Sequence, residues 1–330
     1  MQSPVKGLLL GLASLSAMAQ SLEDLVLASS SAPDVILKIS GQADSAQGNG
    51  YQGKVTWNAN KALTLFLSGE KSNLATTQPV PSPNGNTSTG FSLGGGVLWG
   101  AVFLGLQYEH SELSDLLTSR RYTFQPLLEK GNWRFGLEFS TRTTDFDRLQ
   151  FTNLTLNTPS GPLFITGYAD LNLSDTGLGG TCEYEGDTWR FYGAYTHYSY
   201  GSFEGNTNVS RIRNAGGTVS PEVFKALSGR WVDRVERISA SRLSRGVALL
   251  DSTVTAGIEA NLVFTRWGVE ANQDEDHLTG QRSQTFTGIA GWKATLRFTL
   301  ELHLGTTHSE ALGSNQFAGL TLIYRTRPGF

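Results

Sequence analysis

Two residues near the middle of the chain have the types and the spacing that nucleophilic catalysis requires. His197 and Ser199 stand two apart in the string T-H-Y-S-Y-G at 196–201. If this segment is a strand, both side chains point to the same face, and the imidazole can take the proton of the serine hydroxyl. A serine activated in this way attacks acyl esters, provided that a third group orients the histidine. The candidates for that third group are Asn206, Asn208 and Asp251.

The H-x-S-x-G part of this string resembles the active-site string of two families of outer-membrane enzymes, phospholipase A and the lipid A 3-O-deacylases. The resemblance implies lipid hydrolysis, with Ser199 as the nucleophile and His197 as its base. The sequence departs from those families at Tyr200, where they usually carry Asn. No metal site and no cofactor are expected, because the other histidines and the single cysteine, Cys182, show no ligand spacing.

Arginine and glutamate form a second pattern, which repeats along the chain. The segments N-W-R-F-G-L-E-F at 132–139 and T-L-R-F-T-L-E-L at 295–302 match closely, and shorter versions occur at 188–191 and 266–270. Arg and Glu four apart share one face of a strand. Because a charge on a lipid-facing strand position costs about 2–4 kcal/mol at mid-membrane, this face is predicted to meet water or to pair inside. The predicted pore-lining residues are Arg134, Glu138, Arg190, Glu259, Arg266, Glu270, Arg297 and Glu301. Two roles remain open for them and can coexist, namely ion pairs that cross-link the wall and charges that guide ions.

The stretch at 253–272 shows what kind of element must position these charges. Val254, Ala256 and Ile258 alternate with polar residues, and after a short break the alternation resumes around Trp267. Each half therefore reads as a strand with one apolar and one polar face, and the short break makes the pair an antiparallel hairpin.

Similar strands follow one another from residue 34 almost to the end. We expect about 16 strands, or about 14 if the weaker segments Leu149–Leu156 and Phe164–Leu173 belong to a loop. Short connections alternate with long ones, and an even number of strands places both termini of the chain on one side of the membrane. These features predict an all-β fold, a single-chain antiparallel transmembrane β-barrel with short periplasmic turns and longer external loops.

Six of the seven tryptophans lie beside the short turns and on the apolar parity. A soluble β-sandwich has no reason to keep its tryptophans at one end and on one face of a sheet. A membrane barrel does, because an amphipathic ring is best placed at the boundary between headgroups and acyl chains. The predicted lipid-interface girdle consists of Trp57, Trp99, Trp133, Trp189, Trp267 and Trp292.

The composition and the N-terminus agree with this class. Charged residues make up 17% of 330, the mean hydropathy is −0.20 and the net charge is −3. These values argue against a helical membrane protein and against nucleic acid as a partner. Residues 1–19 read as a signal peptide, with Lys6 before an apolar run and the A-x-A form at Ala17-Met18-Ala19. A short periplasmic segment over 20–33 and the barrel over 34–330 would follow.

One long segment, 204–249, interrupts the strand pattern. Ser220-Pro221 has the form of a helix start, and Arg230, Arg234 and Arg237 then form a stripe at helical spacing. If the segment folds inward, the stripe narrows the pore as a constriction loop. If it stays outside, its arginines suit the phosphates of lipopolysaccharide. A solvated amphipathic loop is the third interpretation.

From about residue 34 to Phe330, the pattern of the chain resembles the transmembrane β-barrels of the Gram-negative outer membrane, which commonly end in an aromatic residue. The last predicted strand ends at about Tyr324, with R-T-R-P-G before the final Phe. The resemblance implies a location in the cell outer membrane and a porin-like channel for small hydrophilic solutes. Expected partners are outer-membrane lipids and lipopolysaccharide, those solutes and the barrel assembly machinery. The alternatives are a lipid hydrolase that uses His197 and Ser199, and a barrel component of an export or assembly system.

Overall fold

The computed structural model describes residues 33–45, 48–60, 62–73, 87–113, 117–158, 161–201, 204–209, 249–277, 280–310 and 313–327. The predicted signal peptide and the arginine stripe at 230–237 lie outside the described residues, as does nearly all of the short segment 20–33. Within the described part of the chain, no helix is long and apolar enough to cross a membrane.

The regular structure of the described residues consists of strands. They are β1 (Asp34–Asp44), β2 (Asn49–Asn60), β3 (Leu63–Asn73), β4 (Thr87–Trp99), β5 (Val102–Leu113), β6 (Leu117–Lys130), β7 (Trp133–Thr158), β8 (Gly161–Glu185), β9 (Trp189–Tyr200), β10 (Glu204–Val209), β11 (Leu250–Asn261), β12 (Thr265–Asp276), β13 (Arg282–Lys293), β14 (Phe298–Ser309) and β15 (Gly313–Arg325).

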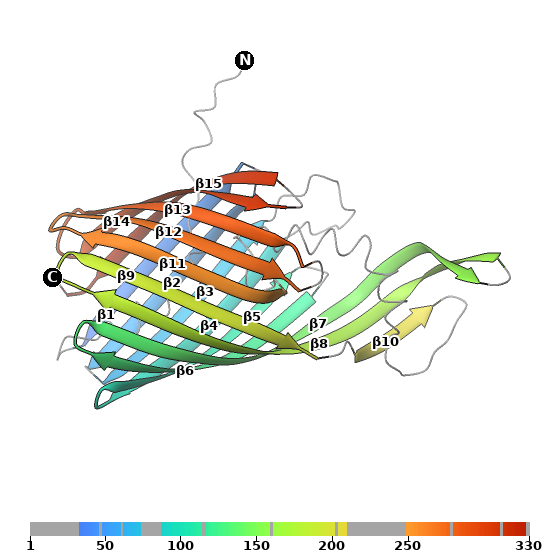
Figure 1. Ribbon diagram of the computed structural model, residues 1–330, viewed down its shortest axis with the longest axis horizontal. Helices are drawn as coiled ribbons and strands as arrows, with labels where there is room; N and C mark the ends of the chain where they lie inside the picture. Colours follow the sequence, from blue (N-terminus) through green and yellow to red (C-terminus); the bar gives the residue numbers. More distant parts are fainter. Residues whose placement is uncertain are drawn as a thin grey trace, which may run out of the picture.

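The strands close into an antiparallel barrel (Figure 1). Strands β1 to β9 pair in order, β9 then pairs with β11, and β15 returns to pair with β1. The ring contains 14 strands, and β10 lies outside it on the edge of β8. The predicted all-β barrel is therefore confirmed, with the lower of the two expected strand counts.

Strands β7 and β8 continue beyond the barrel as a long hairpin (Figure 1), with 26 and 25 residues. The segments Leu149–Leu156 and Phe164–Leu173, counted separately in the larger estimate, are the outer parts of these two strands. Their alternation is weak because, outside the closed ring, neither face of the hairpin has to meet lipid. The start of the predicted loop 204–249 is also a strand, because β10 pairs with residues 167–172 of β8.

Short connections occur at both ends of the barrel, since three or four residues also join β1 to β2, β5 to β6 and β14 to β15 at the opposite end, so the predicted alternation of short and long connections holds only in part. Six connections of two to four residues lie together at the end that also holds the start of β1 and the end of β15, and these are the ones called short connections: β2–β3, β4–β5, β6–β7, β8–β9, β11–β12 and β13–β14. Two of them turn at glycines with left-handed backbones, Gly100 with φ 65° and Gly131 with φ 60°. This conformation suits tight hairpins and is unfavourable for residues with a Cβ. The predicted hairpin at 253–272 is β11 and β12, and its turn belongs to the same end.

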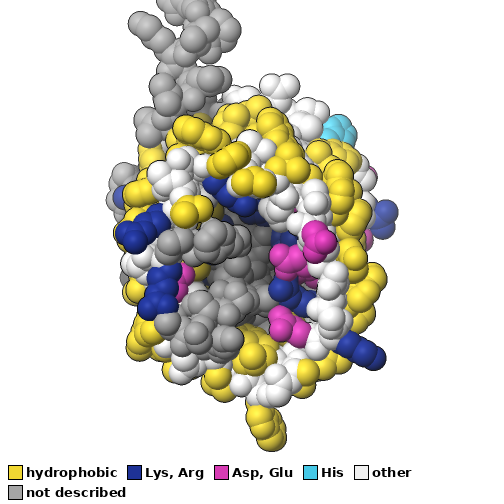
Figure 2. Space-filling view, turned by 90° about the vertical axis from the view of Figure 1, so that its left-hand side faces the viewer, with side chains coloured by type: hydrophobic (Ala, Val, Ile, Leu, Met, Phe, Trp, Pro, Cys, Tyr) yellow, Lys and Arg dark blue, Asp and Glu magenta, His cyan; other side chains and the backbone are white. Residues whose placement is uncertain are grey.

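The two faces of the wall differ sharply in polarity. On β12, for example, Trp267 and Val269 are 55% and 59% exposed, whereas the adjacent Glu270 is 3% exposed. Figure 2 looks onto the end with the short connections, where hydrophobic side chains outline the rim and charged side chains lie inside it. A closed barrel whose outer face is this apolar is built to be surrounded by lipid.

The inner wall also contains an apolar cluster, which the sequence did not suggest. Phe66, Phe103 and Leu127 pack together on the inward faces of β3, β5 and β6. Gly96 on β4 makes room for this packing, since a Cβ there would stand 1.9 Å from Cζ of Phe103. Charged side chains also share this part of the interior, since the Lys54 ammonium stands 4.3 Å from the centroid of the Phe66 ring.

Candidate functional site

The main polar feature of the interior is a chain of ion pairs that begins on β6 and β7. The Arg134 guanidinium is 2.9 Å from Glu183, 2.6 Å from Glu185 and 3.1 Å from Glu129. These partners stand opposite or diagonal to Arg134 on the two neighbouring strands. The register of the barrel therefore selects them, since inward side chains that face each other across a pair of strands are within contact distance.

The chain of ion pairs continues along β8, β9 and β11. Arg190 is 2.7 Å from Glu183 on one side and 3.2 Å from Glu259 on the other. Both contacts are buried, with 7% of the Arg190 side chain and 2% of the Glu259 side chain exposed. Arg190 thus bridges two carboxylates, and each carboxylate is shared with a second arginine.

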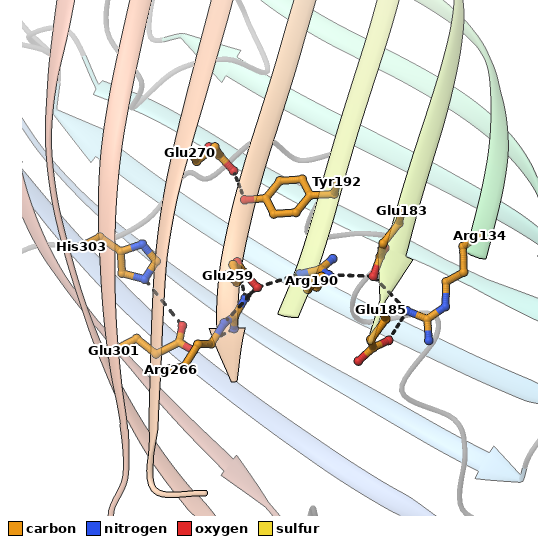
Figure 3. Close-up of polar contacts among 10 residues, drawn as sticks. All are labelled: Arg134, Glu183, Glu185, Arg190, Tyr192, Glu259, Arg266, Glu270, Glu301 and His303. Carbon is orange, nitrogen blue, oxygen red and sulfur yellow. Dashed lines mark hydrogen bonds and ion pairs between the residues drawn. The ribbon is translucent and has the colours of Figure 1, made fainter. Parts of the chain in front are cut away.

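Arg266 on β12 carries the ion pairs onward to β14. Its guanidinium is 2.7 Å from Glu259 and 3.0 Å from Glu301, and Glu301 is 3.6 Å from His303. Figure 3 shows the run of contacts from Arg134 to His303 across the wall. We call the following set the ion-pair belt: Glu129, Arg134, Glu183, Glu185, Arg190, Glu259, Arg266 and Glu301.

The belt ties together seven strands and has more carboxylates than guanidinium groups, five against three. Its exposed end at Glu129 and Glu185 is screened by water, so these contacts add little stability. Its buried centre differs, because removing one member of a buried pair typically costs about 3–5 kcal/mol. The belt is therefore both a cross-link of the wall and a fixed pattern of charge along the interior.

A second polar group lies on the side of the belt away from the short connections. Arg121 on β6 and Arg142 on β7 stand directly opposite each other, which is unfavourable for two like charges. A carboxylate flanks each arginine, with Glu109 3.7 Å from Arg121 and Asp175 2.6 Å from Arg142. Arg142 also donates to Tyr200 Oη at 2.9 Å. Extending the inward parity of β7 beyond Glu138 would have identified Arg142 from the sequence.

The structure brings together most of the predicted pore-lining residues, and the ion pairs of the belt join neighbouring strands, as the cross-linking interpretation expects. Glu138 accepts a hydrogen bond from Gln125 at 2.9 Å, and Glu270 accepts one from Tyr192 at 2.9 Å. Arg297 lies exposed at the short connection between β13 and β14, away from the belt.

The predicted girdle residues all lie on the outward face, near the short connections at the ends of their strands. Their exposed fractions range from 45% for Trp57 to 80% for Trp99. The remaining members are Trp133, Trp189, Trp267 and Trp292. This is the placement that an aromatic belt at a membrane interface requires.

His197 and Ser199 both lie on the outward face of β9, as their parity predicts. In the described part of the chain, neither side chain makes a hydrogen bond or an ion pair. Asp251, a candidate to orient His197, is instead 2.6 Å from Nδ1 of His277. Asp251 is therefore not engaged with His197, and the side chains of the other two candidates, Asn206 and Asn208, are outside what the structure describes.

The described residues contain no group of three or more His, Cys, Asp or Glu side chains that could hold a metal ion. The constriction residues Arg230, Arg234 and Arg237 lie outside the described residues, so their relation to the belt remains a prediction.

The closed ring, the apolar outer face and the polar inner face define the class of the protein. It is a porin-like transmembrane β-barrel of the outer-membrane type.

No family model matches the sequence, and no curated protein matches it either. Solved structures that resemble the fold are outer-membrane proteins of Pseudomonas aeruginosa. OpdK, solved with vanillate, is 10% identical, with 89% of this chain and 97% of that chain covered and a TM-score of 0.35. For OpdO the identity is 9%, the coverages are 94% and 99%, and the TM-score is 0.39. For OprE the values are 8%, 89%, 97% and 0.41. At these TM-scores the likeness alone carries no argument, and the class rests on the barrel itself.

Proposed function

We propose that this barrel is a channel for small hydrophilic solutes across the outer membrane, and that the ion-pair belt lines its passage. The observation that carries the proposal is the continuous belt on the inward face of a closed barrel, with contacts of 2.6–3.2 Å between neighbouring charges. Charges on this face are held in place without a partner outside the protein. A wall of this kind favours hydrophilic solutes, because their polar groups can bind the wall charges in place of the water that they lose on entry.

The number of strands supports the same proposal. Side chains fill the interior of a barrel of about 8 strands, and the diameter grows roughly linearly with strand number. A 14-strand ring therefore has a wider interior than its own wall side chains occupy. In this proposal the segment 204–249 supplies the constriction through Arg230, Arg234 and Arg237.

The proposal includes three further expectations that rest on the sequence. Residues 1–19 are a signal peptide for export, and 20–33 form a short periplasmic segment. The barrel assembly machinery inserts the chain, and the lipid partners are those of the outer membrane, lipopolysaccharide included.

Planar-bilayer conductance tests the channel. The refolded full-length protein is expected to insert with uniform conductance steps, and a variant lacking 210–248 is expected to show larger steps because a constriction has been removed. The absence of steps in both proteins, with folding confirmed by heat-modifiable migration, would reject the channel.

A further inference from the structure

Two cations on the outer face of the barrel have no partner in the described part of the chain. Lys71 on β3 and Arg120 on β6 are both exposed, both on the outward parity and both at the strand ends away from the short connections. Neither makes a hydrogen bond or ion pair with a described residue. By contrast Arg282, an outward cation at the same end, is 3.3 Å from Glu275.

Aromatic rings fill the surface between and below the two cations. Arg120 is directly opposite His110, which is directly opposite Phe91, so the three form one row across β4, β5 and β6. The rings of Phe91 and His110 are 5.2 Å apart. The next row toward the middle of the wall pairs Tyr108 with Tyr122, whose rings are 5.0 Å apart.

The wall becomes apolar immediately below these rings. Leu106 and Phe124 form the next row on the same outward parity, with 65% and 39% exposed, and Leu93, with 48% exposed, stands beside Tyr108 in the row above. From the rim to the middle of the wall, the surface therefore changes from cations to stacked rings and then to aliphatic and aromatic side chains. A lipid with an anionic headgroup and several acyl chains presents the same order of chemistry along its length.

We propose that Lys71, Phe91, Tyr108, His110, Arg120 and Tyr122 form a binding site for a phosphorylated glycolipid of the outer leaflet, the lipid A part of lipopolysaccharide. Lys71 and Arg120 are three strand spacings apart and lie in adjacent rows, one two-residue step apart, which together gives about 16 Å. That separation suits two phosphates on one headgroup better than a single phosphate. Each cation makes charge-assisted hydrogen bonds to phosphate oxygens, while the rings support the sugar and the upper acyl chains.

One acidic residue limits the strength of this site. Glu112 is also outward and exposed, one two-residue step beyond His110 on β5 and in the same cross-strand row as Lys71. It repels a phosphate bound between the cations. The Glu112→Gln variant should therefore retain the glycolipid more strongly than the natural protein does.

The site deepens the lipopolysaccharide expectation of the proposed function and is tested separately from conductance. The refolded full-length barrel in detergent is titrated with diphosphoryl lipid A, with the same lipid lacking its phosphates, and with phosphatidylglycerol, and bound lipid is counted by native mass spectrometry. Diphosphoryl lipid A should bind most tightly, and the double variant Lys71→Ala/Arg120→Ala should lose about tenfold or more in affinity. Control variants Arg282→Ala and Lys130→Ala, which remove a paired cation and one beside a short connection, should bind as the natural protein does.

Equal retention of dephosphorylated lipid A or of phosphatidylglycerol would overturn the proposal, because either result would mean a general lipid annulus. Undiminished binding by a folded double variant would overturn it as well. Bound lipid A on a protein without conductance steps would support this site and reject the channel. Conductance steps from a protein that shows no phosphate-dependent lipid binding would support the channel and reject this site.

Discussion

Arg266 on β12 and Glu301 on β14 form an ion pair at 3.0 Å although a complete strand, β13, lies between them. The residue of β13 that stands between the two is Gly291, which is directly opposite both of them. A Cβ at position 291 would lie 3.1 Å from Cβ of Arg266 and 3.5 Å from Cγ of Glu301. Because Gly291 has no side chain, it leaves a gap in which the Arg266 side chain can lie across β13 and contact Glu301 on β14.

The first prediction concerns this gap. Gly291→Val places a branched side chain between Arg266 and Glu301, and it should destabilise the barrel by about 1–3 kcal/mol through overpacking and loss of the ion pair. Denaturant unfolding in lipid vesicles measures the change. Gly288→Val is the matched control, because Gly288 lies on the outward face of the same strand with its nearest atom 3.7 Å from the added Cβ. Equal losses of unfolding free energy in the two variants would show that the space at Gly291 does not contribute to the stability of the barrel.

A second gap leads to the second prediction. Tyr192 on β9 donates its hydroxyl to Glu270 on β12 at 2.9 Å, across β11 at Gly257, where a Cβ would be 2.2 Å from Cζ of Tyr192. Tyr192→Phe should lower the free energy of unfolding by about 1 kcal/mol, the usual value for one hydrogen bond. Gly257→Ala should cost more because the ring must leave its place. Gly193→Ala, on the outward face, is the control, and a Gly257→Ala protein as stable as this control would contradict the arrangement.

The sequence predicts the faces of this barrel well and the partners of its charges poorly. Alternation assigns Trp267 to the outside and Glu270 to the inside, and both assignments hold. It does not supply the register, so the sequence predicts Arg–Glu pairs on adjacent strands without identifying the partners. Arg266 pairs with Glu259 on the neighbouring β11 and with Glu301 on β14, and the register of the strands determines that choice.

The length of β7 and β8 could not be predicted for a related reason. Alternation identifies a strand only where one face meets lipid, and it fades where the hairpin leaves the ring. The pattern beyond Phe146 therefore looked like separate weak strands, although the backbone continues without a turn. Glu129 and Glu185 of the belt were missed because both stand at strand ends, where the sequence shows a turn rather than a face.

The third prediction tests how the girdle is placed in the membrane. Trp267 and Trp292 lie on the outward face near the short connections and are 55% and 57% exposed. In vesicles, their fluorescence should be quenched more by lipids brominated near the headgroup than by lipids brominated near the end of the acyl chain. Proteins that keep a single tryptophan, at 267 or at 292, allow the two depths to be compared. Stronger quenching by lipids brominated near the end of the acyl chain would contradict the placement of Trp267 and Trp292 at the membrane interface.

The fourth prediction concerns hydrolysis. Because Asp251 pairs with His277 rather than with His197, Ser199→Ala and His197→Ala should leave the release of fatty acid from phospholipid vesicles at the level of the natural protein. Release is followed by mass spectrometry, with folding checked by heat-modifiable migration. A drop in release that both variants share would reinstate the serine as a nucleophile.

The last prediction concerns the charge at the centre of the belt. Glu259 accepts hydrogen bonds from Arg190 at 3.2 Å and from Arg266 at 2.7 Å, and it is 2% exposed. Glu259→Gln keeps the shape of the side chain but leaves both arginines with less negative charge beside them. The substitution makes the electrostatic potential along the belt more positive. If ions pass along the belt, anions should therefore permeate more readily relative to cations than they do in the natural protein. The permeability ratio of potassium to chloride should fall by about twofold or more. It is obtained from the reversal potential in a salt gradient.

Two controls separate this effect from a general change of net charge. Glu112→Gln removes the same charge from the outer face and should leave the reversal potential unchanged. Glu259→Asp keeps the charge and should preserve most of the selectivity, even if the shorter side chain weakens one of the two ion pairs. Glu259→Gln should also lower the free energy of unfolding by about 3 kcal/mol, as expected when one member of a buried ion-pair network is neutralised. A destabilised protein with unchanged selectivity would mean that the belt holds the wall together without facing the path of the ions.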